Sequence, residues 1–311
     1  MGQVPVKDVR KLRTHRWQRR DSSCDIDVRF VLAITSEVLH NRGMREDERR
    51  RRFHDLHVSG TFLMPNPHDL GSCRLLSELG FEALATTSGG LAASLGRRDM
   101  SVSRDQLVEH VTSLCAATDL PVNVDAEQCF PASPGGIEAT VALLAEAGAA
   151  GCSIEDWDPD DACVEAVGLP TERVALAASV ARLHGMVLTA RAENHLHGRS
   201  DLDDTIARLR AYANAGAHVV YAPGLVAPED IARAVAESGA PLNVLVVPGG
   251  PSADQLGGLG VRRLSVGSSL ARIAYGALVR AAEALRGTGV LDPDAPYLPR
   301  ALAESAFIED R

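Results

Sequence analysis

The sequence predicts a (β/α)8 barrel, the α/β fold also called a TIM barrel. Short β-rich runs alternate with helix-period segments eight times between residues 53 and 290. Eight such units in about 230 residues match the number and size of the units of this fold. Two observations argue against the alternative, a doubly wound open sheet. No Gly-x-Gly-x-x-Gly follows the first strand, and polar residues close the strands throughout the chain rather than at one switch point.

The expected elements follow one another in a regular order. Strands are expected at 61–66, 83–87, 122–126, 151–155, 187–192, 219–222, 242–247 and 264–266. Helices are expected at 69–79, 104–117, 135–147, 172–184, 202–215, 228–238, 252–258 and 269–286. In the third helix, Ile137, Val141 and Leu144 recur at helical spacing and form one apolar stripe. Pro134 suits the first turn, where a missing N–H costs nothing, and Gly148 suits the end of the helix.

Three regions are expected: a basic N-terminal extension of residues 1–52, partly disordered or helical, the barrel at 53–290, and a tail at 291–311. Three prolines in the tail indicate that it wraps the body or a neighbouring subunit. The extension holds 14 Lys or Arg against 8 Asp or Glu, a charge of +6, so the net charge of −9 leaves −15 for the remainder. An acidic body argues against a nucleic-acid surface. The Arg49–Arg52 run predicts an interaction arm, a solvated helix or a disordered leader. Met44 is an alternative start, which would leave the residues before it outside the working protein.

Several classes of protein are disfavoured by composition. No stretch approaches the roughly 20 apolar residues that span a membrane. The apolar run at 30–35 is too short for the core of a signal peptide, so we expect a cytoplasmic protein without a membrane partner. Six cysteines are scattered without a Cys-x-x-Cys pair, which favours reduced thiols. Residues 53–311 contain no lysine, so this region cannot form a lysine Schiff base.

Carboxylates close the third and fourth expected strands. Asp125 and Glu127 end the third strand and should face the same way, because side chains alternate with period two along an extended segment. Two such carboxylates repel each other unless a cation or a proton intervenes. Glu155 closes the next strand and should be their neighbour. We expect the three acids to hold Mg²⁺, with Mn²⁺ as the alternative, because hard cations prefer oxygen ligands. The other interpretation is a helix cap or an ion pair with an arginine.

Candidate substrate-binding residues follow two other strands. Arg191 and Glu193 end the fifth strand, where an arginine can bind a substrate carboxylate through two hydrogen bonds or pair with a barrel acid. Segment 86–90, Thr-Thr-Ser-Gly-Gly, follows the second strand. Its hydroxyls and backbone N–H groups suit a carboxylate or phosphonyl anion, although plain turns use the same residues. Asp99 lies further along, in a region expected to be a loop or lid.

Four other residues have weaker assignments. Cys129 follows the acidic pair and is a candidate nucleophile, but nothing near it in the sequence activates a thiol, so it is interpreted as inert. His195 and His197 lie in the fifth loop and are candidates for moving protons, or are simply solvated. Trp157 is expected to pack against the rim of the barrel.

With these residues in place, the sequence resembles the isocitrate lyase/phosphoenolpyruvate mutase superfamily over roughly residues 53–290. Four segments carry the resemblance: Phe62–Asp69 with its Asn-x-x-Asp, Ala85–Asp99, the acidic motifs Asp125-Ala126-Glu127 and Ile154-Glu155-Asp156, and Arg191-Ala192-Glu193. The resemblance implies a (β/α)8 barrel, often with its last helix exchanged between subunits, in homodimers or homotetramers. It also implies magnesium, small 2-oxo or 2-hydroxy acid substrates, and an enolate whose negative oxygen a cation stabilises.

The resemblance also implies roles for individual residues. Asp125 and Glu127 would contact the metal directly, and Glu155 would contact it through water. Arg191, with Glu193 beside it in the motif, would bind the substrate carboxylate. The remaining roles fall on the segment after the second strand: Thr87, Ser88 and Gly89 would hold the anionic end of the substrate, and Asp99 would contact the metal shell or the reacting group.

The sequence departs from the family in the loop after the fourth strand. Established lyases of the group carry Lys-x-Cys-Gly-His there, with the cysteine as acid and base. Segment 156–165 contains Cys163 without lysine, glycine or histidine, and without the asparagine of phosphonopyruvate mutases. The candidate proton donors are therefore Cys163, Glu165 and His195. Glycines that usually follow the metal motif are replaced in segment 128–131, which predicts a different backbone, since glycine-only conformations are closed to other residues.

Three functions remain open at this point. The first is a magnesium-dependent lyase that cleaves a C–C bond of a small 2-hydroxy or 2-oxo di- or tricarboxylic acid. The second is a mutase or hydrolase that acts on a P–C bond. The third is a barrel without turnover that serves as a binding or structural subunit, an interpretation that the altered loops favour.

Overall fold

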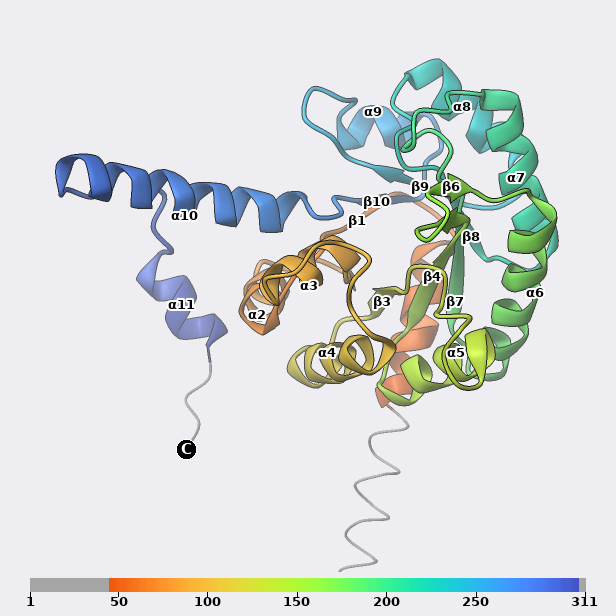
Figure 1. Ribbon diagram of the computed structural model, residues 1–311, viewed down its shortest axis with the longest axis horizontal. Helices are drawn as coiled ribbons and strands as arrows, with labels where there is room; N and C mark the ends of the chain where they lie inside the picture. Colours follow the sequence, from red (N-terminus) through yellow and green to blue (C-terminus); the bar gives the residue numbers. More distant parts are fainter. Residues whose placement is uncertain (1–44, 308–311) are drawn as a thin grey trace, which may run out of the picture. The chain divides into compact units, whose positions relative to one another are not determined.

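The computed structural model describes residues 45–307, and this region confirms the expected barrel (Figure 1). The barrel strands are β1 (Phe62–Met64), β2 (Leu84–Ala85), β3 (Val122–Asp125), β4 (Gly151–Glu155), β7 (Val187–Arg191), β8 (Val219–Tyr221), β9 (Leu242–Leu245) and β10 (Arg263–Ser265). They form one sheet of eight strands in the order β1-β10-β9-β8-β7-β4-β3-β2. A short antiparallel hairpin, β5 (Trp157–Asp158) with β6 (Cys163–Val164), is inserted after β4.

The two edge strands of the sheet, β1 and β2, approach each other and nearly close the barrel. Ala85 N donates to Pro65 O over 3.0 Å. The side-chain amide of Asn66 donates to Thr86 O over 2.8 Å, and its Oδ1 accepts from the backbone N–H groups of Val266 and Gly267. Asn66 therefore joins the ends of β1, β2 and β10, which gives the first residue of the Asn-x-x-Asp segment a structural task.

Most of the helices surround the sheet, close to the positions that the sequence predicts. They are α2 (Leu70–Glu78), α3 (Ser88–Ser94), α4 (Arg104–Ala117), α5 (Gly136–Glu146), α6 (Gly168–Leu183), α7 (Leu202–Asn214), α8 (Pro228–Glu237), α9 (Ala253–Gly258), α10 (Ser269–Thr288) and α11 (Arg300–Ala306). Two of them, α3 and α11, are not among the expected helices. Helix α6 also begins four residues early, because Pro170 is accommodated in its first turn.

Helix α5 shows how local sequence builds these elements. Ile137, Val141 and Leu144 are buried as the apolar stripe predicts. Pro134 lies outside the first turn, because the N-cap is Gly135 with a φ of 77°. A left-handed residue is cheapest as glycine, so Gly135 and not Pro134 begins the helix. Gly148 follows the helix with a φ of 97°, in agreement with its expected place at the end.

A helix at 45–56 closes the end of the barrel from which the strands begin. Phe53 is fully buried and packs edge-on against Phe62 of β1. Arg50 donates to Ala145 O (2.7 Å) and Ala149 O (3.2 Å), at the end of α5. Part of the arginine run is thus a structural component of the barrel. The boundary expected between residues 52 and 53 falls inside this helix, while the rest of the basic extension and Met44 lie outside the described residues.

Helix α10 departs from the usual place of a barrel helix. Only Ala271 of α10 is buried, and its exposed large apolar residues are Ile273, Leu278, Val279 and Leu285. In Figure 1, α10 extends away from β10 instead of lying along the sheet. The tail then returns, and α11 packs against α2. Among residues 45–307, no helix is both long enough and apolar enough to cross a membrane.

Candidate active site

A cavity of about 180 Å³ opens among the C-terminal ends of the strands, where barrel enzymes place their active sites. Five of the residues predicted for the site line it: Thr87, Ser88, Asp99, Asp125 and Arg191. They come from the ends of β2, β3 and β7 and from the loop between α3 and α4. The structure therefore brings together residues that are up to 104 positions apart in the chain, from Thr87 to Arg191.

Arg191 is the centre of the site. Its Nη1 lies 2.6 Å from Asp125 Oδ1, its Nη2 lies 3.2 Å from Glu155 Oε2, and its Nε lies 2.7 Å from Glu193 Oε1. The ring of Tyr221 lies beneath the guanidinium at 5.4 Å. Of the two interpretations of Arg191, the ion pair with barrel acids is the one present in this structure.

The charges around Arg191 do not balance. Burial raises the pKa of Glu155 and of Glu193 by more than Arg191 lowers it, and neighbouring carboxylates raise both pKa values further. Burial works against the charge of Arg191 as well, but Glu193, Glu155 and Asp125 together raise its pKa. The guanidinium therefore remains charged, and three acidic side chains share this one cation.

Glu127 and Asp99 are two further acidic residues close to Asp125. Burial raises the pKa of Glu127 to about 7, and repulsion by Asp125 and Asp99 contributes to the shift. Asp99 approaches Gly89 so closely that a Cβ on Gly89 would lie 2.9 Å from Asp99 Oδ2 and 2.8 Å from Ser268 Oγ. A larger residue at position 89 would displace the side chains of Asp99 and Ser268.

The backbone after β3 corrects the expected geometry of Asp125 and Glu127. The strand ends at Asp125, and Glu127 is left-handed with a φ of 52°, so the period-two argument does not apply to this pair. Cys129 and Phe130 are also left-handed, at 60° and 49°, although neither is glycine. This left-handed conformation is open to residues other than glycine, at a strain on the order of 1–3 kcal/mol for each residue.

The segment after β2 is the start of α3 rather than a plain turn. The side chain of Thr87 caps α3 by accepting from Gly90 N, and its hydroxyl lies 2.8 Å from Ser268 Oγ. Ser88 N donates to Asp125 Oδ2 over 3.0 Å. Asp125 N in turn donates to the Thr86 hydroxyl over 2.8 Å. One of the expected anion-binding N–H groups, that of Ser88, thus binds a carboxylate of the protein itself.

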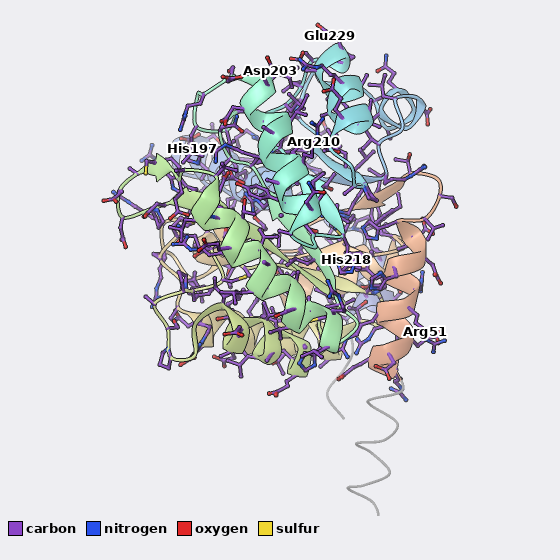
Figure 2. All side chains as sticks on the ribbon, turned by 90° about the vertical axis from the view of Figure 1, so that its right-hand side faces the viewer. Arg51, His197, Asp203, Arg210, His218 and Glu229 are labelled. Atoms are coloured by element: carbon purple, nitrogen blue, oxygen red, sulfur yellow. The ribbon has the colours of Figure 1, made fainter. Side chains whose placement is uncertain are left out.

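The candidate proton donors lie outside the cavity lining. Cys163 is exposed on the β5–β6 hairpin. Glu165 is paired with Arg173 at 2.7 Å. His195 has a buried Nε2 with no hydrogen-bond partner in the structure. His197 stacks on Trp157, with ring centroids 3.4 Å apart, and Figure 2 shows it toward the opposite end of the barrel from Arg51 and His218.

Asp156 has a role that the sequence did not reveal. It is fully buried, and its Oδ1 accepts from Glu193 N over 2.8 Å. Its Oδ2 accepts from Arg208 Nη1 (3.0 Å) and from the Tyr212 hydroxyl (2.6 Å). Asp156 therefore holds the Arg191–Glu193 segment in place from behind. Its position directly after Glu155 was the available signal, but its partners lie on α7.

The site offers carboxylate oxygens, which are the ligands that magnesium prefers. Among residues 45–307, no three His, Cys, Asp or Glu side chains have a geometry that could hold a metal ion. Magnesium usually needs only one or two protein carboxylates, because it keeps several waters. Asp125 and Glu127 provide such oxygens, and burial together with repulsion from Asp125 and Asp99 raises the pKa of Glu127, so a cation beside this pair would be stabilised. Glu155 faces Arg191 instead, so a metal role for it stays a prediction.

The fold and the site define a barrel enzyme whose acidic cavity is organised around one arginine. The chain belongs to the phosphoenolpyruvate phosphomutase family, whose sequence profile matches residues 53–286, and this confirms the resemblance to the isocitrate lyase/phosphoenolpyruvate mutase superfamily. A candidate lyase/mutase from Burkholderia cenocepacia J2315 is 45% identical, and its crystal structure superposes with a TM-score of 0.79 over 84% of this chain and 96% of the other.

Two further relatives have names that state an activity. Probable 2-methylisocitrate lyase 2 of Corynebacterium glutamicum is 30% identical over 239 residues, which cover 73% of this chain and 77% of the relative. The structure of an oxaloacetate acetylhydrolase in complex with its product oxalate is 25% identical, with a TM-score of 0.73 over 82% of this chain and 93% of the other. The superfamily consists of lyases and mutases that act on small carboxylic acids, and the prediction of an enzyme is confirmed at this level.

Proposed function

We propose that the protein is a magnesium-dependent lyase that cleaves a C–C bond of a small 2-hydroxy or 2-oxo di- or tricarboxylic acid. The observation that carries the proposal is the convergence of Arg191 with Asp125, Glu155 and Glu193 at the cavity, with Glu127 and Asp99 adjoining. The volume of about 180 Å³ suits a small acid. Bound magnesium, or manganese in its place, would neutralise negative charge that develops on substrate oxygens.

We assign the roles in metal and substrate binding to residues around the cavity. Asp125 and Glu127 would hold the metal, with Glu155 as its water-mediated contact. A substrate carboxylate would bind Arg191 in place of part of its contacts with the acids, since a guanidinium binds carboxylates through two parallel hydrogen bonds. The other assigned roles are substrate contact by Thr87, Ser88 and Gly89, and a proton or metal-shell contact by Asp99.

The proton donor is the least defined part of the mechanism. Glu193 is held by Arg191 and by the Asp156 contact, so it orients the arginine. Cys163 would act only if the β5–β6 hairpin closed over the cavity. Phosphorus NMR with phosphonopyruvate distinguishes the alternative, in which the enzyme acts on a P–C bond.

Titration calorimetry with magnesium and oxalate tests the metal assignment. Oxalate imitates an enolate, and we expect it to bind the wild type only when magnesium is present. Asp125→Ala should weaken this binding at least 100-fold, because it removes a metal ligand and an Arg191 partner together. The matched control is Asp203→Ala, which removes an exposed carboxylate. Equal binding by the wild type and Asp125→Ala would show that the metal is held elsewhere.

We also propose that α10 packs on the barrel of a second subunit in a homodimer or homotetramer. Leu63, in the middle of β1, is 42% exposed, although barrel strands are normally covered by helices. Leu63 and Leu264 line a groove of about 550 Å³ beside α9. The exposed apolar residues of α10 would fill the equivalent groove of the partner.

A charge placed on α10 should therefore dissociate the assembly. Leu278 is 63% exposed, and we expect Leu278→Asp to convert the oligomer to monomers, as measured by size-exclusion chromatography with light scattering. Leu183→Asp is the matched control, because Leu183 on α6 is 83% exposed and lies on a different helix. A monomeric wild type, or an unchanged mass for Leu278→Asp, would refute the exchange of α10.

A further inference from the structure

A second arginine, Arg263, lines the same cavity from inside the barrel. It precedes Ser265 by two residues on β10, so both side chains point inward, and Arg263 lies deeper. It is only 2% exposed and is among the largest fully buried side chains. The interior of such a barrel is normally filled by bulky aliphatic residues. A guanidinium at this depth therefore needs a specific explanation.

The contacts of Arg263 are all with neutral groups. Its Nε donates to Asn243 Oδ1 over 3.0 Å, and its Nη2 donates to the Thr189 hydroxyl over 2.8 Å. Its Nη1 lies 3.4 Å from His57 Nε2. Among the described residues no carboxylate forms an ion pair with Arg263, whereas Arg191 has three. A guanidinium has five N–H donors, and these contacts use three of them.

The groups around Arg263 also provide no negative charge that would balance its guanidinium. Burial lowers the pKa of Arg263 to about 9, and the one charge effect that opposes this comes from Tyr221. Burial, followed by repulsion from Arg263, lowers the pKa of His57 to about 3, so His57 is neutral. A buried cation without a partner is strongly unfavourable. An anion that entered the cavity would supply what the chain lacks.

The cavity is suited to such an anion. It is continuous from Asp125 and Arg191 to Arg263, and its inner part is lined by the polar side chains of Asn123 and Asn243. The inner wall is thus polar, and Arg263 keeps two N–H donors that no described contact uses.

We propose that Arg263 anchors an internal subsite for a carboxylate group of a small acid, which reaches it through the cavity that Arg191 shares. The substrate would then carry one carboxylate near Arg191 and another at Arg263. The subsite adds a second carboxylate to the substrate of the proposed function. The identity of the reaction still rests on that proposed function.

Stabilisation by sodium formate tests the subsite. Formate is the smallest carboxylate, and it should raise the urea midpoint of the metal-free wild type, at constant ionic strength maintained with the bulkier anion of sodium MES. We expect Arg263→Met to bind formate at least tenfold more weakly. The variant should be no less stable than the wild type without formate, because a methionine replaces an uncompensated charge. Arg263→Lys, which keeps the charge but not the planar fork, should bind formate with intermediate affinity.

Four outcomes of this experiment would overturn the proposal or part of it. It is overturned if formate has no effect on the wild type, or the same effect on the wild type and both Arg263 variants. It is also overturned if Arg191→Met alone abolishes the effect, since formate then binds only the outer arginine. Chloride as effective as formate would overturn the carboxylate assignment. Magnesium–oxalate binding by the wild type reports the outer site separately, so a failure here leaves the proposed function standing.

Discussion

Arg191→Met is expected to destabilise the protein by about 3–5 kcal/mol, the range for breaking a buried ion pair from one side. The substitution leaves Asp125, Glu155 and Glu193 without the cation that contacts all three. Methionine keeps most of the length of the side chain, so the effect reports charge and hydrogen bonding rather than an empty cavity. Urea unfolding followed by circular dichroism measures the loss.

The loss of stability in Arg191→Met should depend on pH. Burial raises the pKa of Glu155 and Glu193 in the folded state, and without Arg191 nothing opposes this. The folded variant then binds more protons than the unfolded chain, so its stability increases as pH falls toward the ordinary carboxyl pKa. The deficit relative to the wild type should therefore be smaller at pH 5 than at pH 8.

Arg233→Met is the matched control for this experiment. Arg233 also contacts two carboxylates, Asp203 at 2.6 Å and Glu237 at 2.8 Å, but all three side chains are exposed. Exposed ion pairs contribute little to stability, so the control should unfold close to the wild type. An Arg191→Met midpoint equal to that of the control would refute the central role of Arg191.

Asp156→Asn is expected to have the second largest effect, also about 3–5 kcal/mol by the same argument. The carboxylate accepts from Arg208, Tyr212 and the backbone of Glu193, and an amide oxygen cannot satisfy these donors while its NH₂ group faces them. We also expect weaker magnesium–oxalate binding, because Glu193 and Arg191 belong to the segment that Asp156 positions. Unfolding and calorimetry measure the two effects separately.

Asp204→Asn is the matched control, because it weakens only the ion pair with Arg208. Asp204 pairs with the same guanidinium, Arg208 Nε at 2.9 Å, but from the side of α7 and with 33% of its side chain exposed. None of the described hydrogen bonds joins the Asp204 side chain to the active-site segment. It should lose much less stability and retain oxalate binding. If Asp156→Asn retained full oxalate binding, Asp156 would be a purely structural residue.

Local patterns in the sequence predicted most of the barrel. Apolar stripes such as Ile137, Val141 and Leu144 depend on helical periodicity, which the chain displays without its partners. The position of Arg191 and Asp125 at strand ends follows from the same reasoning, because parallel strands end at one face of the barrel. The short helix α3 escaped prediction because its length gives no periodic signal, although Thr87 is a good cap.

The sequence by itself determined the alternation of strands and helices, and that acids and an arginine meet at one end of the barrel. Only the tertiary structure decided that Arg191 contacts Asp125, Glu155 and Glu193, that Cys163 stays outside the cavity, and that Arg263 is buried without an acid. The physical reason is that periodicity specifies which side chains point inward. Which of them meet depends on strand register and on the space that distant side chains leave, and neither is encoded in a local pattern.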